Sequence, residues 1–450
     1  MSTTEITNVE RLEPDSDALL GFSIELPLAG TAAEAYSFEF AGWALGGHSA
    51  AVQIELIAND GAPRRIPIVF PRSDVARCYP QRAENTKVGF WAPVSVIGMT
   101  PEFELLVRVV LENTERVPIA RIRGRHRPLP SRFQPSIQPL LVTSLARTGT
   151  TWMMRLLLEH PAITTLRIYP YECRPGRYWM QLVGGMAEPA YPAQSRSKLG
   201  IFDDEWWAGQ DPLQRGSLSQ NPALQQWFNA RFVEQVALLC QRSLEDCYRE
   251  IAATQDQRTP FYFAEKHLPD DVPGILWELY PKCREIFVVR DPRDMLCSIR
   301  AFNAKRGTLN FSRDTVASED EYILRLGRDG QQLLGGWKAR GNRACLVRYE
   351  DLVLRPLESL SKISRYLAIE ADSSLLEDVL RRALVDTPEL AAHRTAGTAR
   401  ASIGRWRHDL DSSSQLLCEQ VFGEFLKEFG YELNQDLRKK NGQTISLEAT

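Results

Sequence analysis

The sequence predicts an α/β domain built on a parallel sheet flanked by helices, preceded by a small β-sandwich-like domain. In the second half of the chain, short apolar runs alternate with amphipathic helical stretches, which is typical of parallel strands covered on both faces. The first quarter instead shows short alternating runs separated by turn residues. A segment rich in proline and arginine, 124–138, separates the two patterns and indicates a stiff linker.

The order of these patterns predicts five regions along the 450 residues. A hydrophobic content of 44% and a charged content of 25% give the chain ample material for two cores. The regions are a flexible tail over 1–17, a β-rich accessory domain over 18–123, the linker over 124–138, the α/β domain over 139–436 and a C-terminal tail over 437–450.

Composition excludes several classes of function. A net charge of −3 provides no overall attraction to nucleic acid, and no apolar run approaches the length of a membrane span. The eight cysteines form no Cys-x-x-Cys pair and suggest neither a zinc site nor a disulfide framework. The N-terminus also lacks the basic and apolar regions of a signal peptide, so we expect a cytoplasmic protein. Because the sequence shows no cluster of metal-ligand residues, we also expect that the protein needs no metal.

The accessory domain shows a series of expected strands with turn signals between them. The sequence Asn59-Asp60-Gly61 between two alternating runs predicts a hairpin. Aromatic residues could line a carbohydrate-stacking surface, but such residues more often form the core of a sandwich, and the core interpretation is favoured. The expected strands are 22–26, 36–40, 52–57, 66–70 and 103–111, and the aromatic residues are Trp43, Tyr79, Phe90 and Trp91.

The α/β domain opens with the stretch that organises its chemistry. An apolar strand over 140–142 leads into a hydroxyl-rich loop over 143–151, and a helix follows from Trp152 to His160. The free amides of a first helical turn and the positive end of its dipole attract an anion. Additional donors come from Arg147, Thr148, Thr150 and Thr151, which surround Gly149.

This loop differs from a nucleoside-triphosphate loop, which ends in Gly-Lys-Ser/Thr, because the cation here precedes the glycine. The string from Arg147 to Trp152, Arg-Thr-Gly-Thr-Thr-Trp, resembles the 5′-phosphosulfate loop of the sulfotransferase family. The resemblance implies the P-loop-like sulfotransferase fold, with 3′-phosphoadenosine 5′-phosphosulfate as co-substrate. It covers about 139–435 through five motifs in the family's order, and it does not cover the accessory domain.

The second motif lies where another expected strand, 285–290, ends and a helix opens. Arg290-Asp291-Pro292-Arg293-Asp294, with Ser298 four residues later, resembles the family's 3′-phosphate motif. The resemblance implies that Arg290 and Ser298 bind this phosphate. Two anion sites on one sheet suit a donor that carries phosphate groups at both ends of its ribose.

The third motif, Glu265-Lys266-His267-Leu268-Pro269, follows an expected strand over 261–264. Histidine has the pKa of a general base near neutral pH. The motif is similar to the Lys-x-His-Leu-Pro of cytosolic sulfotransferases, although Glu265 stands at the lysine's place. We expect His267 to act as the base and Lys266 to stabilise the sulfuryl group together with Arg147, with Glu265 as the alternative base.

Two further motifs resemble segments that close over the donor. Tyr349, at the end of a fourth expected strand over 345–349, is a candidate for stacking on adenine, and Trp152 is another. Near the C-terminus, alignment of Gly404 with the family's closing motif implies that Arg400, assisted by Ser402, binds the 3′-phosphate. The aromatic-rich stretch 168–230 between the motifs is expected to supply acceptor contacts, as a lid or as short packed helices.

These motifs together predict a sulfotransferase that moves a sulfuryl group to a hydroxyl or amine of a small-molecule, lipid or glycan acceptor. A non-catalytic nucleotide- or glycan-binding protein is one alternative. A kinase-like phosphotransferase is another, although the lysine of a nucleoside-triphosphate loop is absent. The sequence does not predict the acceptor or the oligomeric state.

Overall fold

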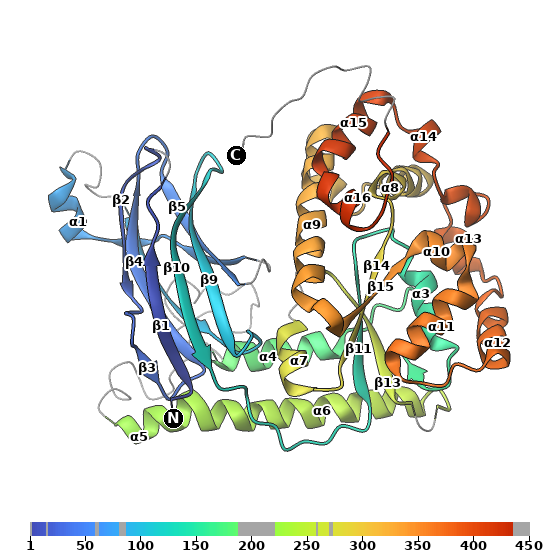
Figure 1. The fold of residues 1–450 in the computed structure, drawn as a ribbon, viewed down its shortest axis with the longest axis horizontal. Helices are drawn as coiled ribbons and strands as arrows, with labels where there is room; N and C mark the ends of the chain where they lie inside the picture. Colours follow the sequence, from blue (N-terminus) through green and yellow to red (C-terminus); the bar gives the residue numbers. More distant parts are fainter. Residues whose placement is uncertain are drawn as a thin grey trace.

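The structure is a computed structural model that describes residues 2–14, 17–58, 63–80, 87–187, 221–257, 260–269 and 273–434. Within these residues an antiparallel β part and an α/β part lie side by side, and the long helix α6 passes below both (Figure 1). The C-terminal tail predicted over 437–450 lies outside the described residues, as do residues 188–220 of the stretch 168–230.

The described residues of the β part form two antiparallel sheets, with the strand orders β3-β1-β10-β9-β5-β6 and β2-β4-β8-β7. All five expected strands are present, although 66–70 is divided between β6 and β7, which belong to different sheets. The bounds are β1 Thr4–Arg11, β2 Leu19–Leu26, β3 Ala32–Ala33, β4 Ser37–Gly46, β5 Ala51–Ala58, β6 Arg64–Pro67, β7 Phe70–Pro71, β8 Lys87–Ser95, β9 Glu102–Leu111 and β10 Arg116–His126.

The two sheets pack face to face around one apolar core, as the sequence predicts. Their strands alternate between buried and exposed residues, and the buried side chains of both sheets belong to a single cluster. Phe90 lies in this core, and Trp91 packs against it. Trp43 and Tyr79 contact each other beside the short helix α1 (Ser73–Cys78), with ring centroids 6.2 Å apart. They are partly buried against a small separate cluster, so the sandwich-core interpretation holds for Phe90 and Trp91 but not for these two residues.

The prediction of a flexible tail over 1–17 is wrong for residues 4–11. These residues form β1, which pairs with both β10 and β3. Ile6 is fully buried, and the Thr4 hydroxyl donates a hydrogen bond to the carbonyl of Ala35 at 2.6 Å. The polar side chains of this segment do not indicate a strand, because the strand is held by backbone hydrogen bonds to its partner strands. Likewise, residues 124–126 of the predicted linker belong to β10.

The α/β part is built on a five-stranded parallel sheet in the order β12-β13-β11-β14-β15, counted over the described residues. The four strands that the sequence predicts are its four longer members, and every residue of the central strand is buried. The bounds are β11 Gln138–Ser144, β12 Ile163–Thr164, β13 Tyr262–His267, β14 Arg284–Val289 and β15 Ala344–Arg348.

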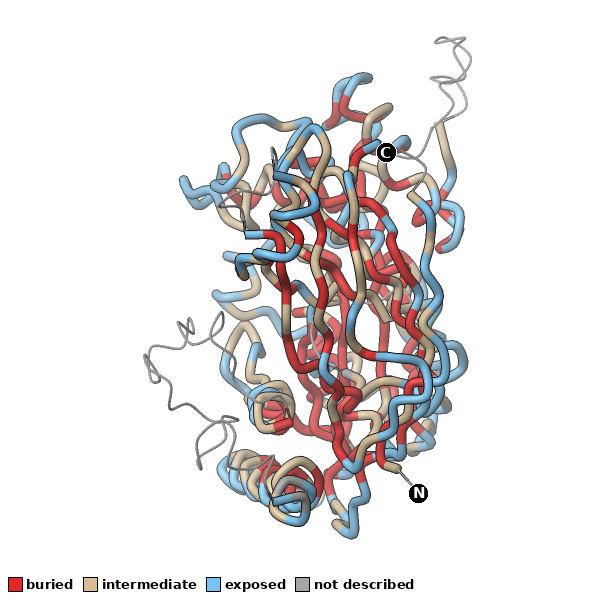
Figure 2. The backbone as a smooth tube through the Cα atoms, turned by 90° about the vertical axis from the view of Figure 1, so that its left-hand side faces the viewer, coloured by how far each residue is buried: buried red, intermediate tan, exposed pale blue. Residues whose placement is uncertain are grey.

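Helices cover both faces of this sheet. In Figure 2, which views the molecule from the side of the β part, buried residues run through the middle of the molecule and exposed residues lie mostly toward its outline. The bounds are α3 Thr150–Leu158, α4 Pro175–Ala187, α5 Pro222–Gln226, α6 Val233–Ala253, α7 Pro273–Leu279, α8 Pro292–Arg306, α9 Glu319–Arg340, α10 Tyr349–Leu354, α11 Pro356–Leu367, α12 Ser373–Ala383, α13 Pro388–His393, α14 Trp406–Asp409, α15 Ser412–Val421 and α16 Gly423–Glu428.

Strand β13 extends further than the sequence predicts and carries the third motif as strand rather than loop. Because successive residues of a strand face opposite sides of the sheet, the extension sorts the motif's side chains. Ala264 packs in the cluster with α3, and Phe263 packs in the cluster with α4 and α6. Lys266 therefore lies on the α3 face, while Glu265 and His267 lie on the α6 face.

The β part docks directly on the helices of the α/β part. Ile97 and Leu129 belong to the same apolar cluster as residues of α4, α6 and α7. The Tyr36 hydroxyl donates to the Glu234 carboxylate at 2.9 Å. On α7, the carboxylate of Glu278 accepts the amide of Gly98 at 2.6 Å and also the amide of Leu129.

Candidate active site

The loop between β11 and α3 has the geometry of an anion cradle. α3 begins at Thr150, two residues before the predicted start, so the hydroxyl threonines already belong to its first turn. Gly149 precedes the helix with φ of +92°, a conformation that favours glycine. A Cβ at this position would collide with the ring of Tyr349, 2.8 Å from Cε2, so the glycine also permits close packing.

A cavity of about 660 Å³ opens over the carboxyl ends of β11, β13 and β14. This volume suits an organic ligand, since such pockets enclose about 300–1,000 Å³. The predicted site residues that line it are Arg147, Gly149, Thr150, Thr151, Trp152, Lys266, His267, Arg290, Ser298, Tyr349 and Ser402. Motifs separated by up to 255 residues of sequence, counted from Arg147 to Ser402, thus converge on one cavity.

Arg147 and Ser298 link the two anion motifs. The Nε of Arg147 donates to the Ser298 hydroxyl at 3.2 Å. Burial, followed by the nearby charge of Arg290, lowers the pKa of Arg147 to about 10. Two cations held close together in a buried site repel each other, so a bound anion would relieve an existing electrostatic cost.

Arg290 ties the cavity to its closing segment. Its guanidinium donates to the carbonyl of Arg147 at 3.0 Å and to that of Ser402 at 2.7 Å. The guanidinium carbon also lies 4.5 Å from the centroid of the Tyr349 ring, whose hydroxyl is 3.0 Å from the Ser402 hydroxyl. Arg290 thus joins the phosphate loop, the aromatic ring and the C-terminal segment at one wall of the cavity.

Lys266 lies beside the threonines of the phosphate loop. Its ammonium donates to the Thr151 hydroxyl at 3.2 Å and to the carbonyl of Pro170, and it lies 3.6 Å from the Glu172 carboxylate. Burial is the main cause that lowers the pKa of Lys266 to about 8, and the neighbouring Arg174 adds to it. A lysine of this kind changes its charge readily when an anion binds nearby.

Glu265 and His267 occupy different positions relative to the cavity. His267 is buried and lines the cavity, whereas Glu265 is fully buried and does not line it. The Glu265 carboxylate accepts hydrogen bonds from the amide of Gly176 at 2.9 Å and from the hydroxyl of Tyr248. His267 therefore forms part of the cavity wall, and Glu265 does not.

Two other predicted residues also lie off the cavity wall. Arg400 is exposed in a short 3-10 turn, Arg400–Ser402, so the structure does not bring its side chain to the site. The Thr148 hydroxyl is buried and donates to the carbonyl of Leu145 at 2.9 Å, which stabilises the loop from within. The family motif located the turn of Arg400 but not the direction of its side chain.

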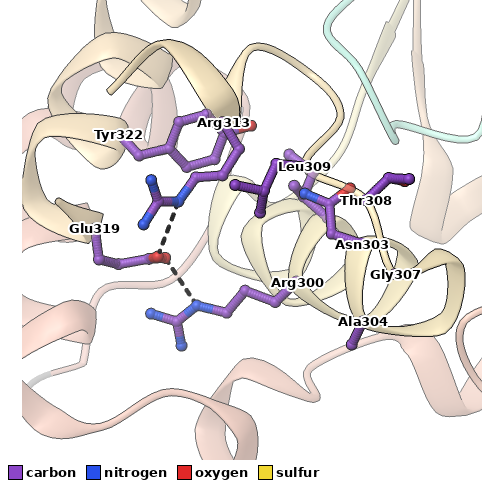
Figure 3. A pocket seen from close by; sticks show the side chains of 10 residues that line it. Arg300, Asn303, Ala304, Gly307, Thr308, Leu309, Arg313, Glu319 and Tyr322 are labelled. Carbon is purple, nitrogen blue, oxygen red and sulfur yellow. Dashed lines mark hydrogen bonds and ion pairs between the residues drawn. The ribbon is translucent and has the colours of Figure 1, made fainter. Parts of the chain in front are cut away.

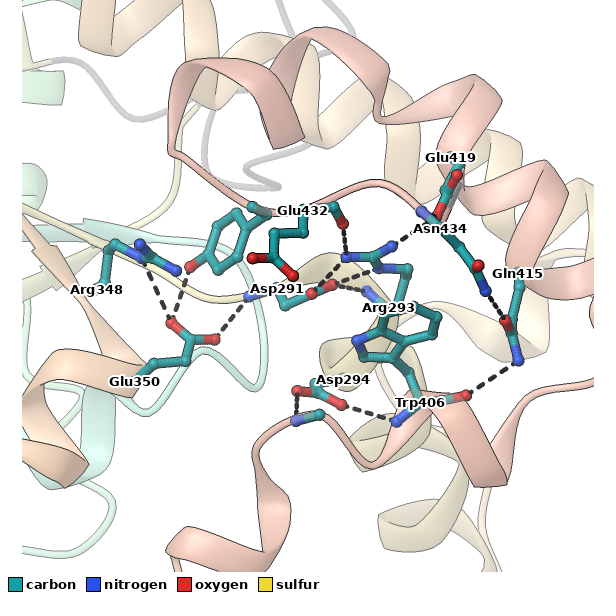
Figure 4. A network of polar contacts seen from close by, with 12 residues as sticks. Asp291, Arg293, Asp294, Arg348, Glu350, Trp406, Gln415, Glu419, Glu432 and Asn434 are labelled. Carbon is teal, nitrogen blue, oxygen red and sulfur yellow. Dashed lines mark hydrogen bonds and ion pairs between the residues drawn. The ribbon is translucent and has the colours of Figure 1, made fainter. Parts of the chain in front are cut away.

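The remaining charged residues of the second motif hold the C-terminal segment rather than the cavity (Figure 4). Arg293 is buried between the carboxylates of Asp291 and Glu419 at 2.8 and 2.7 Å, with its guanidinium carbon 3.7 Å from the Trp406 ring centroid. Asp294 accepts the amides of Gly404 and Trp406 at 2.6 and 2.9 Å. The motif therefore anchors the segment that covers the cavity.

His393, at the end of α13, is a cavity residue to which the sequence assigned no role. Its Nε2 accepts a hydrogen bond from Arg147, and its Nδ1 lies 2.5 Å from the Tyr169 hydroxyl. Burial and the charges of Arg147 and Lys266 lower the pKa of His393 to about 3. Only its place near the start of the fifth motif could have indicated it, because no pattern in the sequence links it to Arg147.

A second cavity of about 370 Å³ lies over α8 and the start of α9 (Figure 3). Arg300 and Arg313 flank it, but both engage the carboxylate of Glu319, at 2.8 and 3.6 Å respectively. The two guanidinium groups thus share one carboxylate, and none of the predicted site residues lines this cavity.

The fold and site define an α/β protein with a cavity and a glycine- and threonine-containing strand-to-helix loop at the carboxyl edge of a parallel sheet. The model of the sulfotransferase family matches residues 139–373, just over half of the 450 residues. The chain therefore belongs to the sulfotransferase family.

Known proteins resemble parts of this chain. Carbohydrate sulfotransferase 3 of Mus musculus is 26% identical over 176 residues, 36% of this chain and 37% of the mouse protein. Carbohydrate sulfotransferase 1 of Danio rerio is 24% identical over 233 residues, 45% of this chain and 53% of the fish protein. The matches thus span about a third to a half of these relatives. The crystal structure of mouse sulfotransferase SULT7A1 complexed with PAP covers 69% of this chain and 90% of its own, with 14% identity and a TM-score of 0.36.

Within the described part of the chain, no three histidine, cysteine, aspartate or glutamate side chains gather in the manner of metal ligands. No helix among the described residues is both long and apolar enough to cross a membrane. All eight cysteines are described, and each is a free thiol.

Proposed function

We propose that this chain transfers a sulfuryl group from 3′-phosphoadenosine 5′-phosphosulfate to a hydroxyl or amine of an acceptor. The observation that carries the proposal is the convergence of the phosphate loop, Lys266 and the Arg290–Ser298 pair on one cavity. Family membership supports the reaction type. The cavity offers donors for two separate anionic groups, which a donor with phosphates at both ends of its ribose would need.

In this proposal each wall of the cavity binds a different part of the donor. The amides of the first turn of α3, with Thr150 and Thr151, hold the phosphosulfate, and Lys266 and Arg147 neutralise the charge of the transferred group. Arg290 and Ser298 hold the 3′-phosphate. The adenine stacks on an aromatic side chain, for which Tyr349 and Trp152 are the candidates because both line the cavity.

His267 is the proposed general base because it is the member of the Glu265–His267 pair that reaches the cavity. It takes the proton of the acceptor hydroxyl while the acceptor oxygen bonds to sulfur. The bond from sulfur to the bridging oxygen breaks, and its electron pair leaves on the 5′-phosphate. Because the leaving group is already a phosphate, positioning and charge stabilisation supply most of the catalysis.

The curated relatives are named for carbohydrate substrates, so we propose a glycan hydroxyl as the first acceptor class to test. Small-molecule alcohols, amines and lipid hydroxyls form the other arms of the screen. The donor carries a ³⁵S-labelled sulfuryl group, and labelled product is separated from labelled donor. Transfer that depends on His267 supports the proposal, and its general-base role predicts a rate loss of ~10²–10⁴ in His267→Ala.

The same screen separates the alternative functions. A kinase-like enzyme would transfer phosphate from ATP with magnesium and would not use the sulfated donor. A non-catalytic nucleotide-binding protein would bind adenosine 3′,5′-bisphosphate without turning over the donor in any arm. Calorimetry of the bisphosphate with and without chelator completes the test, because binding that vanishes with chelator would contradict the proposed metal-free site.

A further inference from the structure

Glu265 is a buried carboxylate that two helices fix beside the cavity. The amide of Gly176, in the first turn of α4, lies 2.9 Å from its Oε1 and 3.1 Å from its Oε2. The hydroxyl of Tyr248, on α6, donates to Oε1 as well. A Cβ on Gly176 would lie 2.7 Å from Oε1, so the glycine is needed for this close approach. The position of the carboxylate is thus set by the fold.

The other side of this carboxylate faces His267. Nε2 of His267 lies 3.5 Å from Oε2 of Glu265, and both side chains are buried. A neutral imidazole that carries its proton on Nε2 can donate to this oxygen and leaves Nδ1 as an acceptor. The separation is long for a hydrogen bond, but catalytic hydrogen bonds of this kind tighten when positive charge develops on the imidazole.

A second buried carboxylate close to His267 is already committed to other partners. Thr143, Glu285 and Arg340 line a small internal cavity together with His267. The carboxylate of Glu285 accepts the Thr143 hydroxyl at 2.5 Å and the Arg340 guanidinium at 2.8 Å. Its charge is therefore compensated, whereas the charge of Glu265 meets only neutral donors among its hydrogen bonds within the described residues.

We propose that Glu265 is a positioning residue for His267. Its carboxylate accepts a hydrogen bond from Nε2–H, orients Nδ1 toward the cavity and stabilises the imidazolium that forms when His267 takes the acceptor proton. Because it does not touch the cavity, it acts on the reaction only through His267. The kinetic part of this inference rests on the proposed function, whereas the coupling of the two side chains does not.

The first experiment measures this coupling in the free protein, without donor or acceptor. The imidazole signals of the six histidines are followed by NMR as the pH is varied, and His267→Ala assigns the signal of His267. Glu265→Gln keeps the size of the side chain and removes its charge. A nearby opposite charge shifts a pKa by about 1–3 units, so the pKa of His267 should fall by at least about one unit in this variant.

Glu285→Gln is the matched control, since Glu285 is equally buried and lies on β14, which is separated from β13 only by β11. It should move the pKa of His267 less than Glu265→Gln does. The titratable and charged groups around the pair include Lys266, Glu172, Arg174, Cys173, Cys247, Tyr248, Tyr280, Cys283, Glu285 and Arg340. Their effects are unchanged between wild type and Glu265→Gln, apart from Tyr248, which contacts the substituted side chain.

Tyr248→Phe gives a second test that keeps the buried charge, in case Glu265→Gln does not fold. Without the Tyr248 hydroxyl the carboxylate is a stronger acceptor for His267, so the pKa of His267 should rise. A fall or an unchanged value in this variant, or an unchanged value in folded Glu265→Gln, overturns the inference. A larger shift in Glu285→Gln than in Glu265→Gln overturns it too.

The second experiment follows kcat/KM against pH, once an acceptor is known. In Glu265→Gln the acid limb should move to lower pH by the shift that NMR measures, and the plateau should fall. A merely structural defect would lower the rate at every pH without moving the limb, and that result contradicts the inference. Coupling seen by NMR without any sulfuryl transfer would overturn the proposed function alone, and normal transfer without coupling would overturn the positioning role alone.

Discussion

Replacement of Gly149 by alanine tests whether the phosphate loop depends on the ring of Tyr349. Gly149 has φ of +92°, and an added Cβ would collide with that ring. Gly307 provides a matched control: it has φ of +64° at the end of α8, and nothing lies within 4 Å of an added Cβ. Both alanine variants carry the strain of the left-handed conformation, and only one carries the collision.

The expected magnitudes follow from the contacts of Tyr349. The left-handed strain costs about 1–2 kcal/mol in either variant. Displacing the ring also weakens its hydrogen bond to Ser402, worth about 1 kcal/mol, and its contact with the Arg290 guanidinium, worth about 0.5–2 kcal/mol. Gly149→Ala should therefore lose roughly 1.5–3 kcal/mol more unfolding free energy than Gly307→Ala.

Denaturant titration measures the free energy of unfolding, and calorimetry measures the affinity for adenosine 3′,5′-bisphosphate. Gly307→Ala should bind with the affinity of the wild type. Gly149→Ala should bind at least tenfold more weakly, which corresponds to about 1.4 kcal/mol, because the loop amides no longer converge on the phosphate. Equal affinities in the two folded variants would show that this loop does not form the donor site.

Three further predictions concern single side chains of the cavity. Arg290→Ala should weaken bisphosphate binding by roughly 1.5–3 kcal/mol in calorimetry, through loss of a charge-assisted contact; unchanged affinity would place the 3′-phosphate elsewhere. Burial lowers the pKa of Lys266 from 10.5 to about 8, so the free protein loses this charge as the pH rises through about 8. Bisphosphate affinity should fall over that range with proton uptake on binding, and Lys266→Met should abolish the pH dependence. His393→Ala should retain most of the transfer rate that His267→Ala loses, because both ring nitrogens of His393 are engaged; an inactive, folded His393→Ala would make His393 the better candidate for the base.

Local patterns in the sequence were sufficient to predict the parallel sheet and its anion motifs. The strands of the sheet are apolar and buried on both faces, and the loop glycine and threonines have direct backbone consequences. Parallel strands place their carboxyl ends at one edge, so the convergence of Arg147 and Arg290 followed from the order of the elements. These features depend on short-range chemistry, which a single sequence contains.

The features that the sequence did not predict depend on tertiary context. Lys266 and His267 face opposite sides of the sheet because β13 continues through both residues, and pairing with β11 determines the length of β13. Arg400 is exposed although its neighbour Ser402 is buried, because tertiary contacts of Ser402 with Arg290 and Tyr349 hold the short turn that carries both residues. The strand β1 exists because β10 offers it an edge.

Because the β part docks on α7, we do not expect a fragment cut at the sequence boundary between the two parts to fold normally. Tyr36, Ile97 and Leu129 complete an apolar cluster that also contains Leu141 of the central strand. A fragment that starts at the central strand would expose this cluster and leave the half-buried carboxylate of Glu278 without its amide donors. The β part thus completes the apolar core of the α/β part, so we expect both parts to unfold in one cooperative thermal transition.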